Sequence, residues 1–230
     1  DAARAAGGVV CNGPDSPTVS TAEHAMMLLL AVTKELPTHM ASAAAGLGGP
    51  KVATSLELDG ATLGLVGLGR IGSRVAVAAQ ALGMNVVAHD PGLSSSSVDG
   101  VRLVNLDELF RTAHVVSLHA PSTPTTRHLI DAATIQTMRR GVYIVNCARG
   151  PLIDQEALLA ALEAGQVAGA GLDVTEPEPL PVGHPLLGRP DVIITPHIAS
   201  STAAGRRRLF EHAVDNALAV LAGRPASVVS

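Results

Sequence analysis

Short apolar runs recur along the chain between residues 63 and 195, each a few residues long and rich in Val, Ile or Leu. Gly, Pro, Asp or Asn bounds each run, which is typical of strands that are buried on both faces of a sheet. The pattern therefore predicts buried strands over residues 63–66, 85–88, 115–118, 142–145, 169–174 and 192–195.

Helical patterns lie between these strands, over residues 73–82, 107–112, 134–140 and 154–164. All but the second stop at a glycine, as helices often do. Because strand and helix alternate, we expect an α/β fold with a doubly wound parallel sheet. Two further helices, 21–36 and 203–222, fall outside the alternation, and residues 43–50 indicate a loop or an extended arm.

The composition argues against disorder, since 47% of the residues are apolar and only 16% are charged, and the length suits one large domain or two small ones. With a net charge of -4 no broad basic face is expected, and hence no nucleic-acid partner. The longest apolar run, residues 25–32, is far shorter than the ~20 residues that cross a bilayer, so no membrane partner is expected and the cytoplasm is the default location. Two cysteines far apart in the sequence give neither a disulfide framework nor a zinc pattern, so no metal is expected.

Three glycines follow the first predicted strand in the spacing G-x-G-x-x-G, at Gly67, Gly69 and Gly72. In this motif the first glycine allows a tight turn, the second lets the backbone approach a pyrophosphate, and the third lets helix and strand pack closely. The motif opens a helix, whose N-terminus attracts phosphate. The context therefore predicts a Rossmann-like, dinucleotide-binding domain, although a glycine-rich turn without a ligand is the simpler alternative.

The second predicted strand ends near Asp90, where a carboxylate can accept hydrogen bonds from the ribose hydroxyls of an adenosine. The same carboxylate would repel a 2′-phosphate, and no arginine stands beside it. The expected cofactor is therefore NAD rather than NADP.

Polar residues follow three of the later predicted strands. Arg149 follows the strand 142–145, Asp173 and Glu178 lie at or beyond the end of the next, and His197 follows the last. The carboxyl ends of parallel strands meet at one edge of a sheet, which is where α/β proteins build their sites. Taken singly, each of these residues is equally consistent with an ordinary loop or surface position, so only their convergence indicates a site.

The motifs in order resemble those of the D-isomer-specific 2-hydroxyacid dehydrogenases. They are Gly-Leu-Gly-Arg-Ile-Gly at 67–72, His-Ala-Pro-Ser-Thr-Pro-Thr-Thr at 119–126, Asn-Cys-Ala-Arg-Gly at 146–150, Leu-Asp-Val-Thr-Glu-Pro-Glu-Pro-Leu-Pro at 172–181 and Thr-Pro-His-Ile-Ala-Ser at 195–200. The later segment most resembles the glyoxylate and hydroxypyruvate reductase branch. Two features depart from the family: Lys34 stands where an arginine is usual, and the arm before Gly60 lacks the usual tryptophan.

The resemblance implies catalytic roles for Arg149, Glu178 and His197, and implies that Asp173 holds the nicotinamide amide. Reduction of a 2-oxo acid needs a proton on the carbonyl oxygen, which His197 can supply while Glu178 stabilises the charged ring. Arg149 can bind the substrate carboxylate through its planar fork. The residues expected to bind the cofactor are Gly67, Gly69, Arg70, Ile71, Gly72, Asp90, His119, Pro121, Thr126, Cys147, Ala148 and Asp173. Cys147 has no histidine near it in the sequence, so no thiol nucleophile is expected.

The expected function is therefore hydride transfer between NAD(H) and a small 2-oxo or 2-hydroxy acid of the glyoxylate or hydroxypyruvate type. The alternatives are a noncatalytic NAD-binding regulatory or scaffold protein, a formate dehydrogenase-like enzyme, which usually has Gln at the place of Glu178, and an inactive fragment.

The same resemblance predicts how the chain assembles and which domain of the family it lacks. The family places the helix 21–36 and the arm after it in a two-fold contact, so a homodimer is expected. Residues 1–230 are expected to form one NAD-binding domain with its core at about 25–200. Residues 203–230 are expected to return toward an N-terminal substrate domain that this sequence lacks, so the chain alone should bind NAD(H) but turn over 2-oxo acids very poorly.

Overall fold

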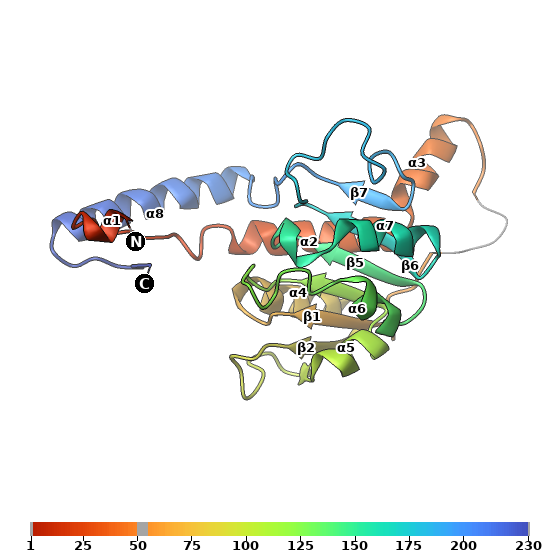
Figure 1. Ribbon diagram of the computed structural model, residues 1–230, viewed down its shortest axis with the longest axis horizontal. Helices are drawn as coiled ribbons and strands as arrows, with labels where there is room; N and C mark the ends of the chain where they lie inside the picture. The colour runs from red at the N-terminus through yellow and green to blue at the C-terminus, as the bar shows by residue number, and fades with distance from the viewer. Residues whose placement is uncertain (1, 50–54, 230) are drawn as a thin grey trace.

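The structure, a computed structural model, describes residues 2–49 and 55–229. In that part of the chain, seven strands form one fully parallel sheet in the order β3-β2-β1-β4-β5-β6-β7 (Figure 1). The strands are β1 (Thr62–Val66), β2 (Asn85–His89), β3 (Arg102–Leu103), β4 (Val115–Leu118), β5 (Val142–Asn146), β6 (Val167–Leu172) and β7 (Val192–Ile194). The doubly wound parallel fold expected from the alternation is confirmed.

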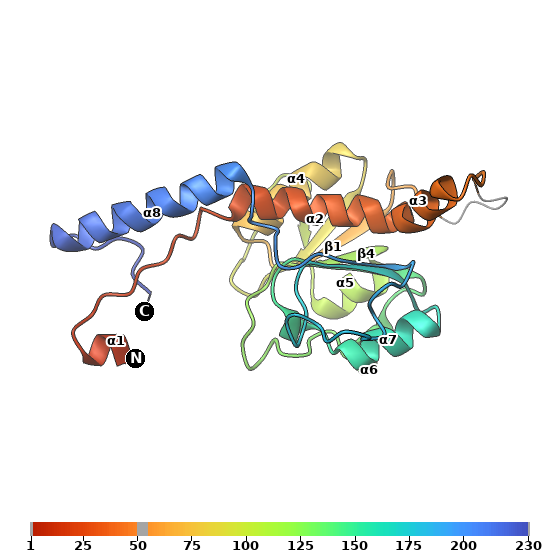
Figure 2. The same cartoon turned by 90° about the horizontal axis from the view of Figure 1, so that it is seen from above.

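Helices cover both faces of the sheet, as Figure 2 shows from above. On one face lie α2 (Thr18–Thr33) and α4 (Arg70–Ala81), which pack on a core that includes Leu28, Leu63 and Val75. On the other lie α5 (Leu106–Thr112), α6 (Ala132–Thr137) and α7 (Gln155–Glu163), over a second apolar cluster. Every residue of β4 and β5 is buried, which explains why these strands show uninterrupted rather than alternating apolar runs.

The chain order reverses between β1 and β4. From β1 the chain moves outward to β2 and β3, and it then returns to place β4 on the other side of β1. In such sheets a crevice opens at this point, beyond the carboxyl ends of the two strands. The Gly-rich turn after β1 and the loop after β4 therefore flank the expected ligand position.

The helix expected over residues 21–36 is wrong in its bounds. Residues 18–33 form α2, and a separate helix, α3 (Leu36–Ala44), follows a turn in which Glu35 takes a left-handed conformation. Pro37 explains the break, because proline has no N–H to donate to the Thr33 carbonyl and its ring would clash with that carbonyl, yet it suits the first turn of a new helix. The expected loop at 43–50 begins correspondingly later, since residues 43 and 44 end α3; Pro50 and the rest of the arm to residue 54 lie outside the described residues.

Other differences are small. The strand expected at 169–174 is shifted to β6, so Asp173 and Val174 lie beyond the strand end rather than in it. α4 begins at Arg70, directly after Gly69, and α6 begins at Ala132 and ends at Thr137. The sequence pattern does not predict β3, because two residues are too few to show a pattern, and it does not predict the single turn α1 (Ala2–Ala5).

α8 (Ala203–Leu221) projects from the body of the protein, with the segment before α2 running back beside it (Figures 1 and 2). Asn216 Nδ2 donates to the Asn12 carbonyl oxygen at 2.9 Å, and Cys11 forms an isolated bridge with Val228. Many apolar side chains of α8 remain exposed: Leu209, Phe210, Val214, Leu218 and Leu221. This helix is therefore an extension with an uncovered apolar side and lies outside both core clusters.

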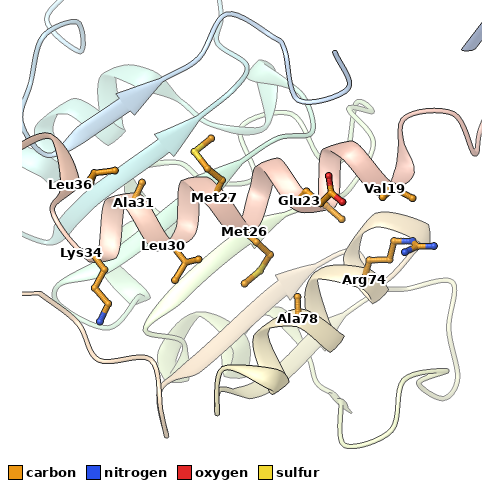
Figure 3. A pocket seen from close by; sticks show the side chains of 11 residues that line it. Val19, Glu23, Met26, Met27, Leu30, Ala31, Lys34, Leu36, Arg74 and Ala78 are labelled. Atoms are coloured by element: carbon orange, nitrogen blue, oxygen red, sulfur yellow. The ribbon is translucent and has the colours of Figure 1, made fainter. Parts of the chain in front are cut away.

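α2 carries a second uncovered apolar surface. A cavity of about 710 Å³ lies along it, between α2 and α4, and Figure 3 shows Met26, Leu30 and Ala78 around it with Lys34 and Arg74 near its ends. Lys34 Nζ donates to the Leu56 carbonyl oxygen at 2.7 Å, so this lysine ties the end of α2 to the segment that leads into β1. Among the described residues no helix is both long and apolar enough to cross a membrane.

Candidate active site

The Gly-rich turn between β1 and α4 is compact on one side and open on the other. Gly67 has a φ of 95°, and a Cβ placed there would lie 2.8 Å from the carbonyl carbon of His119. A Cβ on Gly72 would collide with the Gly67 carbonyl oxygen, so neither position accepts a side chain. Gly69 faces open space, with nothing within 4 Å of its would-be Cβ. The free N-terminal turn of α4 lies beside this space, which fits the pyrophosphate of a dinucleotide.

Asp90 stands just beyond the end of β2 and supports the same turn. Its Oδ2 accepts from the Leu68 backbone N–H at 2.9 Å, and its Oδ1 accepts from the Gly92 N–H at 3.0 Å. A carboxylate has about four acceptor positions, so it retains capacity for ribose hydroxyls. Arg70, at the first turn of α4, pairs with Asp15 at 2.7 Å, and both side chains are exposed.

A pocket of about 490 Å³ gathers most of the other residues expected to bind the cofactor. It is lined by Ile71, His119, Ala120, Pro121, Ser122, Cys147, Ala148 and Arg149, from the ends of β4 and β5 and the start of α4. Thr126 is outside this lining, but its hydroxyl donates to the Pro121 carbonyl oxygen at 2.7 Å and so shapes the loop after β4.

The His119 residue is half-buried behind the Gly-rich turn, and its ring atom Nδ1 is buried. Its Nε2 lies 2.9 Å from the Ser117 hydroxyl, and among the described residues its buried Nδ1 has no hydrogen-bond partner. Burial lowers the pKa of His119 to about 4, because the charged ring would lose its hydration. His119 is therefore neutral near pH 7. In the same pocket, burial and the negative charge of Asp173 raise the pKa of Cys147 to about 12, so its thiol stays protonated near pH 7 and is a poor nucleophile.

Arg149 is presented by the loop after β5. Asn146, fully buried at the end of that strand, donates from Nδ2 to the Arg149 carbonyl oxygen at 2.9 Å and accepts from the Ala148 N–H at 2.9 Å. The Arg149 guanidinium is exposed at the pocket. A Cβ on Gly150 would collide with the Thr175 carbonyl, so the Arg149 loop packs directly on the loop that carries Glu178.

Glu178 and His197 meet at the carboxyl ends of β6 and β7. The Glu178 Oε1 lies 2.6 Å from His197 Nδ1, with side chains 38% and 49% exposed. They line a neighbouring pocket of about 420 Å³, together with Thr175 and Thr195. Among the described residues no hydrogen bond or ion pair joins Arg149 to this pair.

Asp173 is engaged differently from the expectation. Its carboxylate is buried and accepts hydrogen bonds from the Thr195 hydroxyl and from the backbone of Ile198 and Ala199. What the structure shows is an anchor for the loop after β7, and the contact with a nicotinamide amide stays a prediction. Sequence reasoning missed Asn146, Ser117, Thr195 and His24. Asn146 and Thr195 are polar residues at strand ends, and that was the one signal that could have found them.

A Gly-rich turn at a helix N-terminus, at the carboxyl ends of a doubly wound parallel sheet, is the arrangement of a dinucleotide-binding domain. Residues 26–199, more than half of the chain, match the family model described as "D-isomer specific 2-hydroxyacid dehydrogenase, NAD binding domain". The chain belongs to this family, and NAD is the family's cofactor.

Relatives and solved structures agree with this assignment. The chain is 44% identical over 204 residues to a D-3-phosphoglycerate dehydrogenase of Archaeoglobus fulgidus, covering 88% of this chain and 39% of the relative, and 39% identical over 227 residues to that of Bacillus subtilis, covering 98% and 43%. The TT0316 protein of Thermus thermophilus superposes with a TM-score of 0.92 at 45% identity, covering all of this chain and 74% of its own. A glyoxylate reductase from Paecilomyes thermophila superposes with a TM-score of 0.89 at 35% identity, covering 100% of this chain and 70% of the reductase chain. The chain spans about two fifths of the length of the curated relatives.

The neutral His119 ring predicts a pH-dependent stability. An unfolded histidine has a pKa of about 6.5, whereas that of the folded His119 is about 4. The unfolded state therefore binds the additional proton first, and stability is lost as the pH falls from 6.5 toward 4. Between pH 7 and pH 5 this residue should cost roughly 2 kcal/mol of unfolding free energy.

Urea unfolding of the unmodified chain and of His119→Asn at both pH values measures this contribution. Between pH 7 and pH 5 the variant should lose less unfolding free energy than the unmodified chain, by roughly 2 kcal/mol. If both proteins lose the same stability between pH 7 and pH 5, the expected pKa of His119 is wrong.

Proposed function

We propose that this chain carries the cofactor site and the catalytic side chains of an NAD-dependent oxidoreductase that interconverts a 2-hydroxy acid and a 2-oxo acid. The observation that carries the proposal is the Glu178–His197 pair at 2.6 Å, on the sheet edge that also carries the Gly-rich turn and Arg149. Family membership supports the same reaction class.

The contact with Glu178 determines which ring nitrogen of His197 is free to meet a substrate. With Nδ1 donating to Glu178, Nε2 is left to face a substrate oxygen. His197 then gives a proton to the carbonyl oxygen during reduction and takes one from the hydroxyl during oxidation, while Glu178 stabilises the charged ring. Bound NAD(H) supplies or accepts the hydride. Arg149, exposed at the adjoining pocket, binds the substrate carboxylate through its planar fork.

Two alternatives are less well supported. A noncatalytic NAD-binding protein would not need a solvent-accessible carboxylate-histidine pair, yet that pair is formed here. A formate dehydrogenase-like reaction needs no proton donor to a carbonyl, and the position of Glu178 carries a carboxylate where that branch usually has an amide.

The substrate that the comparisons favour is the phosphorylated three-carbon acid. Eight curated relatives at 39–44% identity carry the name D-3-phosphoglycerate dehydrogenase. We therefore place 3-phosphoglycerate and its 2-oxo acid first among candidate substrates. Glyoxylate and hydroxypyruvate, indicated by the motifs, stay second, with one solved glyoxylate reductase at 35% identity in their favour.

Turnover is proposed to need a further domain. The pockets at Arg149 and His197 are open to solvent, where an ion pair with a substrate carboxylate contributes little. The uncovered apolar side of α8, where Phe210 is 69% and Leu221 84% exposed, fits a surface that receives such a domain. We expect the 230-residue chain to bind NADH and to reduce 2-oxo acids far more slowly than a protein of the relatives' length.

The catalytic assignment predicts that His197→Asn and Glu178→Gln reduce kcat by about 10²–10⁴-fold while NADH still binds. The assay is NADH oxidation with a panel of 2-oxo acids, in the longest available form of the protein, next to fluorescence titration of NADH. His184→Asn, a histidine outside both pockets, is the matched control and should keep its activity. Full activity in His197→Asn would exclude this histidine as the proton donor.

Cofactor preference depends on the charge of Asp90. Calorimetry should show NADH binding at least about tenfold more tightly than NADPH, because the carboxylate would face a 2′-phosphate. Asp90→Asn keeps an oxygen for the Leu68 N–H but removes the charge, so it should reduce the difference between the NADH and NADPH affinities. Asp99→Asn, an exposed carboxylate in the following loop, should leave it unchanged. Equal affinities in the unmodified chain would refute the preference.

The cavity of about 710 Å³ between α2 and α4 forms an apolar groove along α2, and this groove is proposed to be a contact between two copies of the chain. Met27 is 42% and Leu30 37% exposed on a helix whose other side is buried, and large apolar surfaces of this kind are usually covered by a partner. Sedimentation should give a dimer at micromolar concentration. Leu30→Glu, which puts a charge in the groove, should give monomers, whereas Leu93→Glu, exposed elsewhere, should not. A monomeric unmodified chain would contradict the proposal.

A further inference from the structure

His197 has an unusual backbone for its residue type. Its φ of 52° lies in the left-handed region, which non-glycine residues rarely occupy because Cβ crowds the backbone. Such a conformation persists only where surrounding interactions hold it. The orientation of the ring toward Glu178 therefore depends on whatever fixes the loop after β7.

One side chain holds this loop on both sides of the histidine. Asp173 Oδ1 accepts from the Thr195 hydroxyl at 2.6 Å and from the Ile198 N–H at 2.9 Å, and Oδ2 accepts from the Ala199 N–H at 2.8 Å. The His197 N–H itself donates to the backbone oxygen of Asp173 at 2.8 Å. Because Asp173 is only 1% exposed, these bonds form away from competing water.

A third residue, His24 of α2, contacts the Thr195 hydroxyl. The only proton of the Thr195 hydroxyl is donated to Asp173, so its oxygen must accept from His24 Nε2, which lies 2.9 Å away. His24 belongs to α2, and its side chain is 14% exposed. A chain of hydrogen bonds thus runs from His24 through Thr195 to Asp173, and links the helix that covers the sheet to the loop that carries His197.

We infer that Asp173, with Thr195 and His24, is the positioning set for His197: it holds the left-handed backbone that aims the ring at Glu178. The inference rests on the proposed function for its catalytic meaning, and it gives Asp173 a task in addition to the expected contact with the nicotinamide amide. The two tasks make different predictions. Loss of a cofactor contact weakens NADH binding, whereas loss of positioning leaves binding intact and disturbs the His197 ring.

The test removes one hydroxyl from the chain of bonds. Thr195→Val has nearly the same shape and lacks the hydrogen bond. Thr137→Val is the matched control, because among the described residues the exposed Thr137 hydroxyl bonds only to the Thr134 carbonyl oxygen in α6. NMR of the full chain with ¹⁵N-labelled histidine detects the Nδ1 proton shared with Glu178, assigned by its loss in Glu178→Gln. This signal requires no turnover, so it tests the positioning even if the proposed reaction is wrong.

We expect Thr195→Val to broaden or lose this signal and to lower kcat on the order of tenfold or more, as small misplacements of reacting groups do. NADH affinity should change less than twofold, and Thr137→Val should match the unmodified chain in all three measurements. Asp173→Asn, where it folds, should act in the same direction and more strongly. An unchanged signal in Thr195→Val, or a weakened NADH affinity with the signal intact in Asp173→Asn, would overturn the inference. So would the absence of the signal from the unmodified chain.

Discussion

The strands of this sheet are all parallel, so all their carboxyl ends lie at the same edge of the sheet. Helices cover both faces of the sheet, so the backbone polar groups of the central strands β4 and β5 are buried. Parallel strands need helical crossovers, which occupy both faces and leave only the two edges of strand ends for polar chemistry. The Gly-rich turn, Arg149, Glu178 and His197 all lie beyond carboxyl ends. The position of the site follows from this constraint before any particular side chain is considered.

Close backbone contacts then bring the loops at that edge together. The Gly-rich turn lies against the backbone of His119 because Gly67 has no side chain, and the Arg149 loop lies against Thr175 because Gly150 has none. A methyl group at either place would separate the loops by about the width of the group, and proximity of reacting groups is a large part of catalysis. The glycines therefore act by letting neighbouring loops approach each other.

Burial separates the polar residues of the edge into two kinds. Arg149, Glu178 and His197 are open to solvent, as their proposed contacts with a substrate require. Asn146 and Asp173 are buried, and they direct hydrogen bonds to backbone groups of the loops that carry the exposed residues. A buried polar group must be paired to be tolerated, so the buried residues hold the exposed ones in place.

The sequence by itself determined most of the succession of strands and helices along the chain, the dinucleotide turn and the polar residues that stand beyond the strand ends, because these depend on local periodicity and on short motifs. It did not determine the break at Glu35, the two-residue strand β3 or the engaged carboxylate of Asp173. His24 and Thr195 are 171 residues apart, and Ser20 and Thr202 are 182 apart, yet each pair is joined by a hydrogen bond. No spacing in the sequence announces such pairs, since they exist only once α2 has packed on the sheet and brought its side chains to the loops after β7.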